Sequence, residues 1–340
     1  MRLTLREYVT APSNGQAPLS GQNWGYVFGA LGAVLFSLKA IFVKLAYQPG
    51  GGLEENQLDA IVLMAMRLGF SMPIYLGIFL WVMRNKKRNG ETLPSASHMF
   101  LAGLLGVLGY YVCAFLDIEG LKYVTAQLER LLLFTYPAFV LLMSMLFLGY
   151  RPRLLSVLAI LLGYSGILVI FSRGDITASS NLWLGTGMIL ACAVFFAAFQ
   201  LLAKPMISRL GSTVFTCCAM FSAGIIIFCH LGVSITADCT LSLSDIPMRI
   251  WYLGIALAVF STLIPSFLVN IAIGRIGAQA TATLGLLSPV ANIVLAIFLL
   301  GEPFGFYDGL GTAMTLVGIG FYSWYSRREL PDTTEKTSRA

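Results

Sequence analysis

Long apolar segments alternate with short polar connections along almost the entire chain. Ten of these segments are long enough for a helix that crosses a bilayer, and they cover residues 24–47, 57–83, 98–118, 123–149, 154–171, 182–203, 212–234, 250–273, 276–300 and 305–325. A hydrocarbon core about 30 Å thick requires about 20 apolar residues in an α-helix. The connections are rich in Gly, Pro, Asn and charged residues, as turns between helices usually are. The pattern predicts an all-α polytopic membrane protein with ten transmembrane helices.

The composition excludes an ordinary soluble domain. Of the 340 residues, 57% are hydrophobic and 11% are charged, whereas soluble domains carry about 25% charged residues. The six cysteines form no C-x-x-C pair, and five of them lie in or at the edge of apolar runs. We therefore expect neither a disulfide framework, nor a metal site, nor a cofactor.

The basic residues predict the orientation of the helices. The net charge is +6, but Lys and Arg lie mainly in short loops, which indicates orientation in a membrane rather than binding of nucleic acid. With the N-terminus in the cytoplasm, 15 of the 22 basic residues fall in cytoplasmic segments, and three, Lys122, Arg173 and Arg249, fall in outer loops. The polar segments 1–23 and 326–340 are then cytoplasmic tails, and the first lacks the short apolar region of a signal peptide.

The chain contains an internal repeat. At a shift of 152 residues the segment 126–149 lies over 278–301, with Ala126, Gln127, Leu132, Pro137, Leu148 and Gly149 over Ala278, Gln279, Leu284, Pro289, Leu300 and Gly301. Chance alignment of two apolar helices is the alternative. The repeat divides the chain into two halves of five helices, 24–171 and 182–325, and an odd number makes the second half enter the membrane inverted. Inverted repeats are typical of transporters whose substrate binds at the repeat interface near the membrane midplane, with alternating access.

The repeat segments resemble a known family. "YPAFVLLMSMLFLG" (136–149) and "SPVANIVLAIFLLGEP" (288–303), together with "FSLKAIFVKLAY" (36–47) and "MRLGF" (66–70), resemble the EamA family of the drug/metabolite transporter superfamily. The segment 109–137 is similar to a bacterial branch of this family, and the resemblance covers residues 24–325. It implies ten helices around a central cavity, and export or exchange of small metabolites, often amino acids, across the bacterial inner membrane. Tyr150 departs from the Gly-Glu that often follows the fourth helix in the family.

Charged residues inside the apolar runs are the candidate site. They are Lys39, Lys44, Arg67, Glu129 and Arg130, and Asp117 ends the third run. A charge at the bilayer centre costs about 2.5–3.5 kcal/mol, so such side chains usually face a cavity or a partner. At 1.5 Å per residue Arg67 lies about 15 Å, Lys39 about 12 Å and Glu129 with Arg130 about 9–11 Å from the outer end of their helices. We predict a polar layer in the outer part of the cavity, with an excess of positive charge for a carboxylate.

Several roles are open to these charges. Glu129 is a candidate to pair with Arg67, to bind a substrate amine or to carry a coupling proton. Because neighbours on a helix point about 100° apart, we expect Glu129 and Arg130 to face different places. The alternative for the whole set is an internal salt-bridge network that only fixes the helices. For Lys44, snorkelling to the interface is favoured over binding.

The second half contributes uncharged polarity. Thr262, Ser266 and Asn270 recur every four residues beside Pro265, and Gln279 with Thr283 forms a second such pair. These side chains bind substrate or join helices by hydrogen bonds, and the sequence does not decide between the two. Pro137 and Pro289 are candidate hinges or simple bends. Tyr110 is a candidate for the cavity floor with Tyr111, Phe134 and Tyr136, although a packing role is favoured, and Gly103, Gly106, Gly163 and Gly166 are expected to pack helices closely.

The predicted function is a secondary transporter that moves small, amino-acid-like or carboxylated metabolites by alternating access, as efflux or exchange. We expect it to act as a monomer or homodimer in the bilayer, with proton coupling. A nucleotide-sugar or drug carrier of the same superfamily is the alternative. A receptor or scaffold is disfavoured, because no loop is long enough to form a domain. The G-x-S-G at Gly163–Gly166 is tied to His230 by no sequence pattern, so we expect no enzyme.

Overall fold

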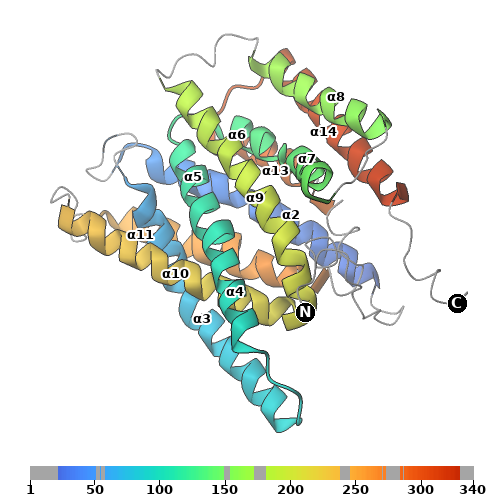
Figure 1. The fold of residues 1–340 in the computed structure, drawn as a ribbon. Helices are drawn as coiled ribbons and strands as arrows, with labels where there is room; N and C mark the ends of the chain where they lie inside the picture. The colour runs from blue at the N-terminus through green and yellow to red at the C-terminus, as the bar shows by residue number, and fades with distance from the viewer. Residues whose placement is uncertain are drawn as a thin grey trace, which may run out of the picture.

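The computed structural model of the chain describes residues 22–50, 54, 58–148, 154–171, 181–237, 246–269, 271–272, 284–285 and 287–329 (Figure 1). All regular elements in these ranges are helical. The first half comprises α2 (Gln22–Tyr47), α3 (Ala60–Arg88), α4 (Ala96–Gly106), the π-helix η2 (Val107–Val112), α5 (Cys113–Gly120), α6 (Ala126–Leu133), α7 (Tyr136–Leu148) and α8 (Leu154–Phe171). The second half comprises α9 (Leu182–Leu210), α10 (Ser212–Ala237), α11 (Met248–Ala258), the π-helix η5 (Val259–Leu263), α13 (Leu287–Leu295), the π-helix η6 (Ala296–Leu300) and α14 (Phe306–Glu329).

The described helices make this a multi-pass membrane protein. Seven helical segments are long and apolar enough to cross a bilayer: Trp24–Tyr47, Ala60–Arg88, Ala96–Gly120, Ala126–Phe147, Leu182–Ile207, Ser212–Thr236 and Met248–Val269. Two shorter apolar helices cover Val157–Val169 and Leu287–Leu300. Each of the ten predicted ranges contains a described helix, but the count of ten spans stays a prediction. Large apolar side chains such as Trp183 and Phe298 are 78% and 80% exposed, as expected of a lipid-facing surface.

Two predicted boundaries differ from the structure. The second helix was expected over 57–83, whereas α3 runs from Ala60 to Arg88. Its last turn holds three basic residues, Lys86 to Arg88, which the negative end of the helix dipole favours. Arg67 is therefore about 10 Å from the helix start rather than about 15 Å. The fourth predicted helix is broken into α6 and α7 at Phe134 and Thr135.

Glycines bring the last helices of the two halves together. Figure 1 shows α8 and α14 side by side at one edge of the bundle. A Cβ atom on Gly166 would collide with the Gly311 carbonyl and the Thr315 side chain, and one on Gly318 would collide with the backbone of Gly163. On α4, Gly106 meets the backbone of Ala219 in the same way. The predicted close-packing role of Gly106 and Gly166 is confirmed.

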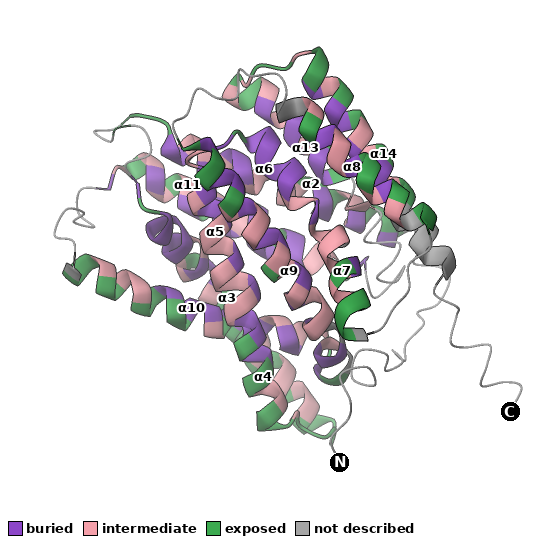
Figure 2. Ribbon diagram, turned by 45° about the horizontal axis from the view of Figure 1, so that its top comes forward, coloured by how far each residue is buried: buried purple, intermediate pink, exposed green. Residues whose placement is uncertain are grey.

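The buried core joins the two halves. One buried cluster contains Ile41 of α2, Leu63 of α3, Met220 of α10 and Leu257 of α11. Figure 2 shows α6 as an almost entirely buried helix in the interior of the bundle. The first half therefore packs against the second through its interior helices, and the polar residues described below lie along this contact.

Side-chain contacts show which loops share an end of the bundle. The Lys122 ammonium lies 5.6 Å from the centroid of the Tyr47 ring, and the Arg249 guanidinium donates to the Leu45 carbonyl at 2.6 Å. Both basic residues were assigned to outer loops, and both lie at the C-terminal end of α2. Elsewhere Arg209 contacts His98 at 3.2 Å, which joins two segments that the predicted topology places in the cytoplasm.

Candidate functional site

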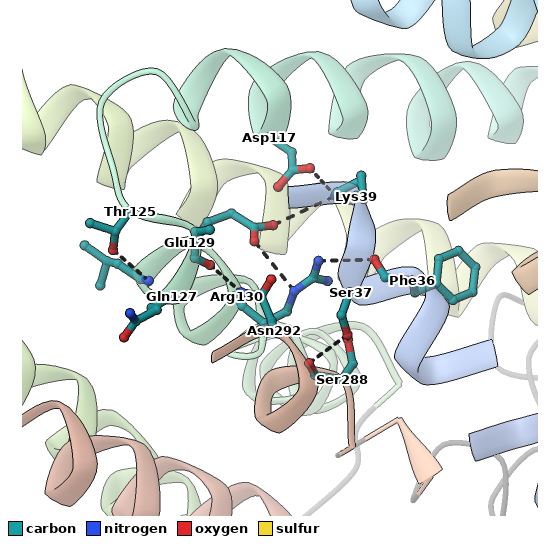
Figure 3. Close-up of polar contacts among 12 residues, drawn as sticks. Phe36, Ser37, Lys39, Asp117, Thr125, Gln127, Glu129, Arg130, Ser288 and Asn292 are labelled. Carbon is teal, nitrogen blue, oxygen red and sulfur yellow. Dashed lines mark hydrogen bonds and ion pairs between the residues drawn. The ribbon is translucent and has the colours of Figure 1, made fainter. Parts of the chain in front are cut away.

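Four charged side chains from three helices meet inside the bundle (Figure 3). We call Lys39 of α2, Asp117 of α5, and Glu129 and Arg130 of α6 the ion cluster. Lys39 Nζ donates to Asp117 Oδ2 and lies 3.8 Å from Glu129 Oε1. Arg130 Nε lies 3.6 Å from Glu129 Oε2, and a terminal nitrogen of Arg130 donates to the Phe36 carbonyl at 3.4 Å. The helices thus bring Lys39 to carboxylates that lie 78 and 90 positions away in the sequence.

The ion cluster is largely buried and electrically balanced. Glu129 is 0% and Asp117 is 1% exposed, Arg130 is buried, and the Lys39 side chain is 17% exposed. Two positive charges face two negative charges, which is the arrangement that makes burial of ions tolerable. Pairing is nevertheless incomplete, because both carboxylate oxygens of Glu129, Asp117 Oδ1 and Arg130 Nε have no hydrogen-bond partner among the described residues.

One sequence expectation about this cluster is wrong. Glu129 and Arg130 were expected to face different places because they are neighbours on a helix. Their Cβ atoms do diverge, but the long side chain of Arg130 brings its Nε to within ion-pair distance of Glu129. Within the described ranges the ion pairs of Glu129 go to Lys39 and Arg130, so the predicted partner Arg67 is not among them.

The second half of the chain holds the start of α6, which carries Glu129 and Arg130. Thr125 caps the helix by accepting the Leu128 N–H at 3.2 Å. Glu302, between η6 and α14, accepts the N–H groups of Ala126 and Gln127 at 2.8 and 3.2 Å. Burial raises the pKa of the Glu302 carboxyl above its ordinary value, although both N–H groups oppose this shift.

Two further contacts join the halves at this point. Asn292 Nδ2 of α13 donates to the Ala126 carbonyl at 2.6 Å. The hydroxyl oxygens of Ser37 and Ser288 are 3.0 Å apart (Figure 3). Sequence reasoning did not single out Ser37, Ser288 or Asn292, although each is a polar residue inside a long apolar run. Glu302 was noticed only as part of the Gly-Glu pattern.

A second polar group surrounds Arg67. Arg67 Nε donates to Thr262 Oγ1 of η5 at 2.8 Å, and Thr262 donates in turn to the Leu257 carbonyl at 3.1 Å. The hydroxyl oxygens of Tyr75 and Ser266 are 3.0 Å apart, and Ser266 donates to the Leu263 carbonyl. Because a hydroxyl has one hydrogen, Tyr75 is the donor to Ser266. Of the predicted pair, Thr262 therefore meets a predicted charge, whereas Ser266 contacts Tyr75.

Tyr110 joins this group from η2. It is close enough to interact electrostatically with Arg67 and Tyr75, and its ring meets that of Phe199 edge to face with centroids 5.4 Å apart. The ring is thus packed, as favoured from the sequence, and it lies within electrostatic range of the arginine. We call Arg67, Tyr75, Tyr110, Thr262 and Ser266 the Arg67 site.

The remaining predicted residues lie outside these two groups. Lys44 is in the last turn of α2, partly buried and in electrostatic range of Glu302. Asn270 and Gln279 lie outside the described residues. Pro137 is the second residue of α7, and Pro289 is the third residue of α13. Both occupy a first turn, where proline removes no helical hydrogen bond, and their hinge role stays a prediction.

Other candidate chemistry finds little support in the described ranges. There, no group of three or more His, Cys, Asp or Glu side chains could hold a metal ion. Ser165 donates to the carbonyl of Leu162, three residues earlier on the same helix, at 2.8 Å. His230 instead contacts the Tyr111 hydroxyl at 3.0 Å. These contacts do not assemble a nucleophile and a base.

Known proteins resemble this chain in sequence and in fold. The model of the EamA-like transporter family matches residues 23–172 and again residues 183–324. The uncharacterized transporter YcbK of Bacillus subtilis (strain 168) is 27% identical over 294 residues, which cover 84% of this chain and 88% of that protein. An uncharacterized transporter of Methanothermobacter thermautotrophicus is 24% identical over 321 residues, which cover 88% and 86%. A crystal structure with a TM-score of 0.57 and 16% identity covers 91% of this chain and 99% of that one, so the two share a fold.

Proposed function

Because the chain belongs to the EamA-like transporter family, we propose that it is a secondary transporter of small metabolites that works by alternating access. In this proposal ten transmembrane helices form two inverted five-helix repeats, 24–171 and 182–325, around a central cavity. The family model matches twice, over nearly these ranges. The polar contacts between the halves, such as Arg67 with Thr262 and Ser37 with Ser288, lie where such repeats would move against each other.

The proposed substrate is a small amino-acid-like or carboxylated metabolite, moved by efflux or exchange. The observation that carries this choice is the charge of the polar interior. The ion cluster and Arg67 together hold three cations, Lys39, Arg67 and Arg130, and two carboxylates, Asp117 and Glu129. An interior with one excess positive charge attracts anions and repels organic cations.

We propose Glu129 as the group that carries a coupling proton. Its carboxylate is completely buried, and neither oxygen has a hydrogen-bond partner among the described residues. Its two ion pairs, at 3.8 and 3.6 Å, are longer than hydrogen bonds. A proton on this carboxyl would leave the Lys39–Asp117 pair intact and would give the ion cluster one net positive charge, because Arg130 would lose its ion-pair partner.

The proposed location is the inner membrane of a bacterium, with both termini in the cytoplasm. The contacts that place Lys122 and Arg249 at one end of α2, and His98 beside Arg209, agree with this topology. Cysteines placed singly at Lys122 and Arg84, in a background without native cysteines, test it in whole cells. A membrane-impermeant maleimide should label the first and not the second, and the reverse pattern would overturn the orientation.

The test of function begins with the culture medium. Metabolites are compared between cells that overproduce the protein and cells that overproduce Arg67→Gln, and those that differ are then assayed with purified protein in proteoliposomes. We expect small carboxylates to accumulate in the medium and an imposed pH gradient to change their flux. Nucleotide sugars or organic cations as the transported species would overturn the substrate class. Flux that ignores the pH gradient would overturn proton coupling through Glu129.

A further inference from the structure

The two polar groups differ in their charge balance. In the ion cluster two cations face two carboxylates, so its net charge is zero. In the Arg67 site the described side-chain hydrogen bond of the cation goes to a hydroxyl group, and Asp117 of the ion cluster acts on Arg67 only at longer range, because no carboxylate oxygen of the described residues forms an ion pair with Arg67. The single excess positive charge of the interior therefore resides on Arg67.

Arg67 is also more accessible than the two carboxylates of the ion cluster, which are 1% and 0% exposed. The unpartnered atoms of the ion cluster are sealed from solvent, as the buried Nε of Arg130 illustrates. Arg67 lies deep among the helices, but it is only partly buried. Its described side-chain hydrogen bond uses Nε alone, and its terminal nitrogens are not among the sealed unpartnered atoms. The two terminal N–H₂ groups of Arg67 thus keep donors and accessible surface for a ligand.

Corresponding π-helices of the two halves lie near Arg67. The π-helices η2 and η5 start at Val107 and Val259, and these positions are 152 residues apart, the shift of the internal repeat. At that shift Tyr110 of η2 corresponds to Thr262 of η5. Thr262 accepts a hydrogen bond from Arg67, and Tyr110 lies within electrostatic range of it. Single turns of π-helix occur frequently at functional sites, because they interrupt the regular backbone pattern.

We propose that Arg67 is the carboxylate-binding subsite of the transporter, completed by Tyr110 from the first half and Thr262 from the second. A carboxylate binds to the terminal nitrogens of the guanidinium through two parallel hydrogen bonds. Thr262 holds Nε and so fixes the plane of the guanidinium, which makes it a positioning residue. The inference rests on the proposed function and narrows it, because it separates substrate recognition from the ion cluster.

The charge balance of the two groups also indicates that the substrate does not need an amine. A substrate amine would require a free carboxylate, yet Asp117 and Glu129 already face Lys39 and Arg130. Recognition therefore depends on the carboxylate of the metabolite and not on its amine. A carboxylic acid that lacks the amine should bind about as well as the matching amino acid, whereas a methyl ester, which has no negative charge, should not.

Binding to the purified full-length protein tests the proposal. The probes are the twenty L-amino acids, their methyl esters and the matching acids without the amine, and the measurement is the concentration of each that stabilises the protein against heat. We expect acids to bind with or without the amine and their esters to bind at least about tenfold more weakly. Arg67→Gln should weaken acid binding by about tenfold to a hundredfold, and Arg67→Lys should give an intermediate loss. Arg84→Gln, on the exposed end of the same helix, is the matched control and should bind like wild type.

The outcomes separate the subsite from the proposed function. If acids bind to wild type and Arg67→Gln binds them equally well, the subsite is wrong while transport of carboxylates stands. Equal binding of acids and esters, or loss of binding when the amine is removed, also overturns the subsite. If no acid stabilises wild type, the carboxylate class fails and the subsite fails with it. Should Arg67→Gln not fold, the acid-to-ester comparison on wild type and Arg67→Lys decides.

Discussion

Removing one charge from the ion cluster should destabilise the protein more than removing an opposite pair. Lys39→Met leaves one positive charge against two negative charges, and Asp117→Leu leaves two against one. The double variant leaves Glu129 and Arg130, which still balance. Because an uncompensated buried charge is far more costly than a neutral apolar substitution, the double variant should be more stable than either single variant.

The magnitude follows from the geometry. At 3.8 Å and an effective dielectric of about 20, the attraction between Lys39 and Glu129 is about 4 kcal/mol, and the contact of Lys39 with Asp117 adds to it. Part of this loss of stability in Lys39→Met is offset, because folding no longer has to remove the lysine ammonium from water. Breaking a buried pair by removing one partner typically costs about 3–5 kcal/mol, so we expect a loss in this range for each single variant and a smaller loss for the double variant.

The assay is reversible unfolding in mixed detergent micelles, analysed as a double-mutant cycle. The matched control is the pair Lys86 and Glu91, which has the same charges at 2.8 Å but lies exposed on the surface. Lys86→Met and Glu91→Leu should have little effect, since exposed pairs are screened by water. If the losses for Lys39→Met and Asp117→Leu simply add in the double variant, the two charges do not compensate each other and the reasoning is refuted.

Three further predictions concern stability. Gly166→Ala should destabilise the protein by several kcal/mol, because its Cβ would collide with backbone atoms of α14, whereas Gly187→Ala, which meets nothing, should be neutral or stabilising in the same unfolding assay. Tyr47→Phe should cost about 1–3 kcal/mol, because it leaves the Ile118 carbonyl without the hydroxyl that it accepts at 3.0 Å. The raised pKa of Glu302 means that the folded state holds this proton more tightly, so stability should be greatest below its ordinary pKa of 4.5 and fall as the pH rises towards the folded-state pKa. Glu302→Gln should flatten this fall in melting curves recorded at successive pH values.

The sequence predicts the helices and the charged residues of the interior because both depend on local properties. An apolar run of sufficient length indicates a transmembrane helix. A charged residue inside the run, such as Glu129, indicates that the fold supplies a polar or oppositely charged partner. The partner itself depends on how distant helices pack. Lys39 and Asp117 are 78 residues apart. Neither segment contains a local sequence signal that α2 and α5 pack so as to bring these side chains together.

The predictions that were wrong or missing also concern features that local sequence does not determine. Arg67 was expected about 15 Å deep because the run of apolar residues begins before the helix does, and a shift of a few residues changes the depth by several ångströms. Glu129 was separated from Arg130 because ideal helix geometry describes Cβ directions and not the reach of a long side chain. The π-helices were not predicted, since an extra residue in one turn leaves no compositional signal.

The asymmetry between the two halves explains why charge and hydroxyl groups meet at one point. At the repeat shift, Thr281 and Ala282 stand where the first half has Glu129 and Arg130, so the repeated helix framework does not itself require these charges. Each charge inside a membrane protein destabilises the fold unless a partner offsets it. In the ion cluster the partners are built into the chain. At Arg67 the described partners are neutral, and part of the electrostatic cost is therefore left for a bound carboxylate to offset. In the proposed function, a cation without an ion-pair partner between the two halves contributes substrate affinity at the interface where alternating access would require it.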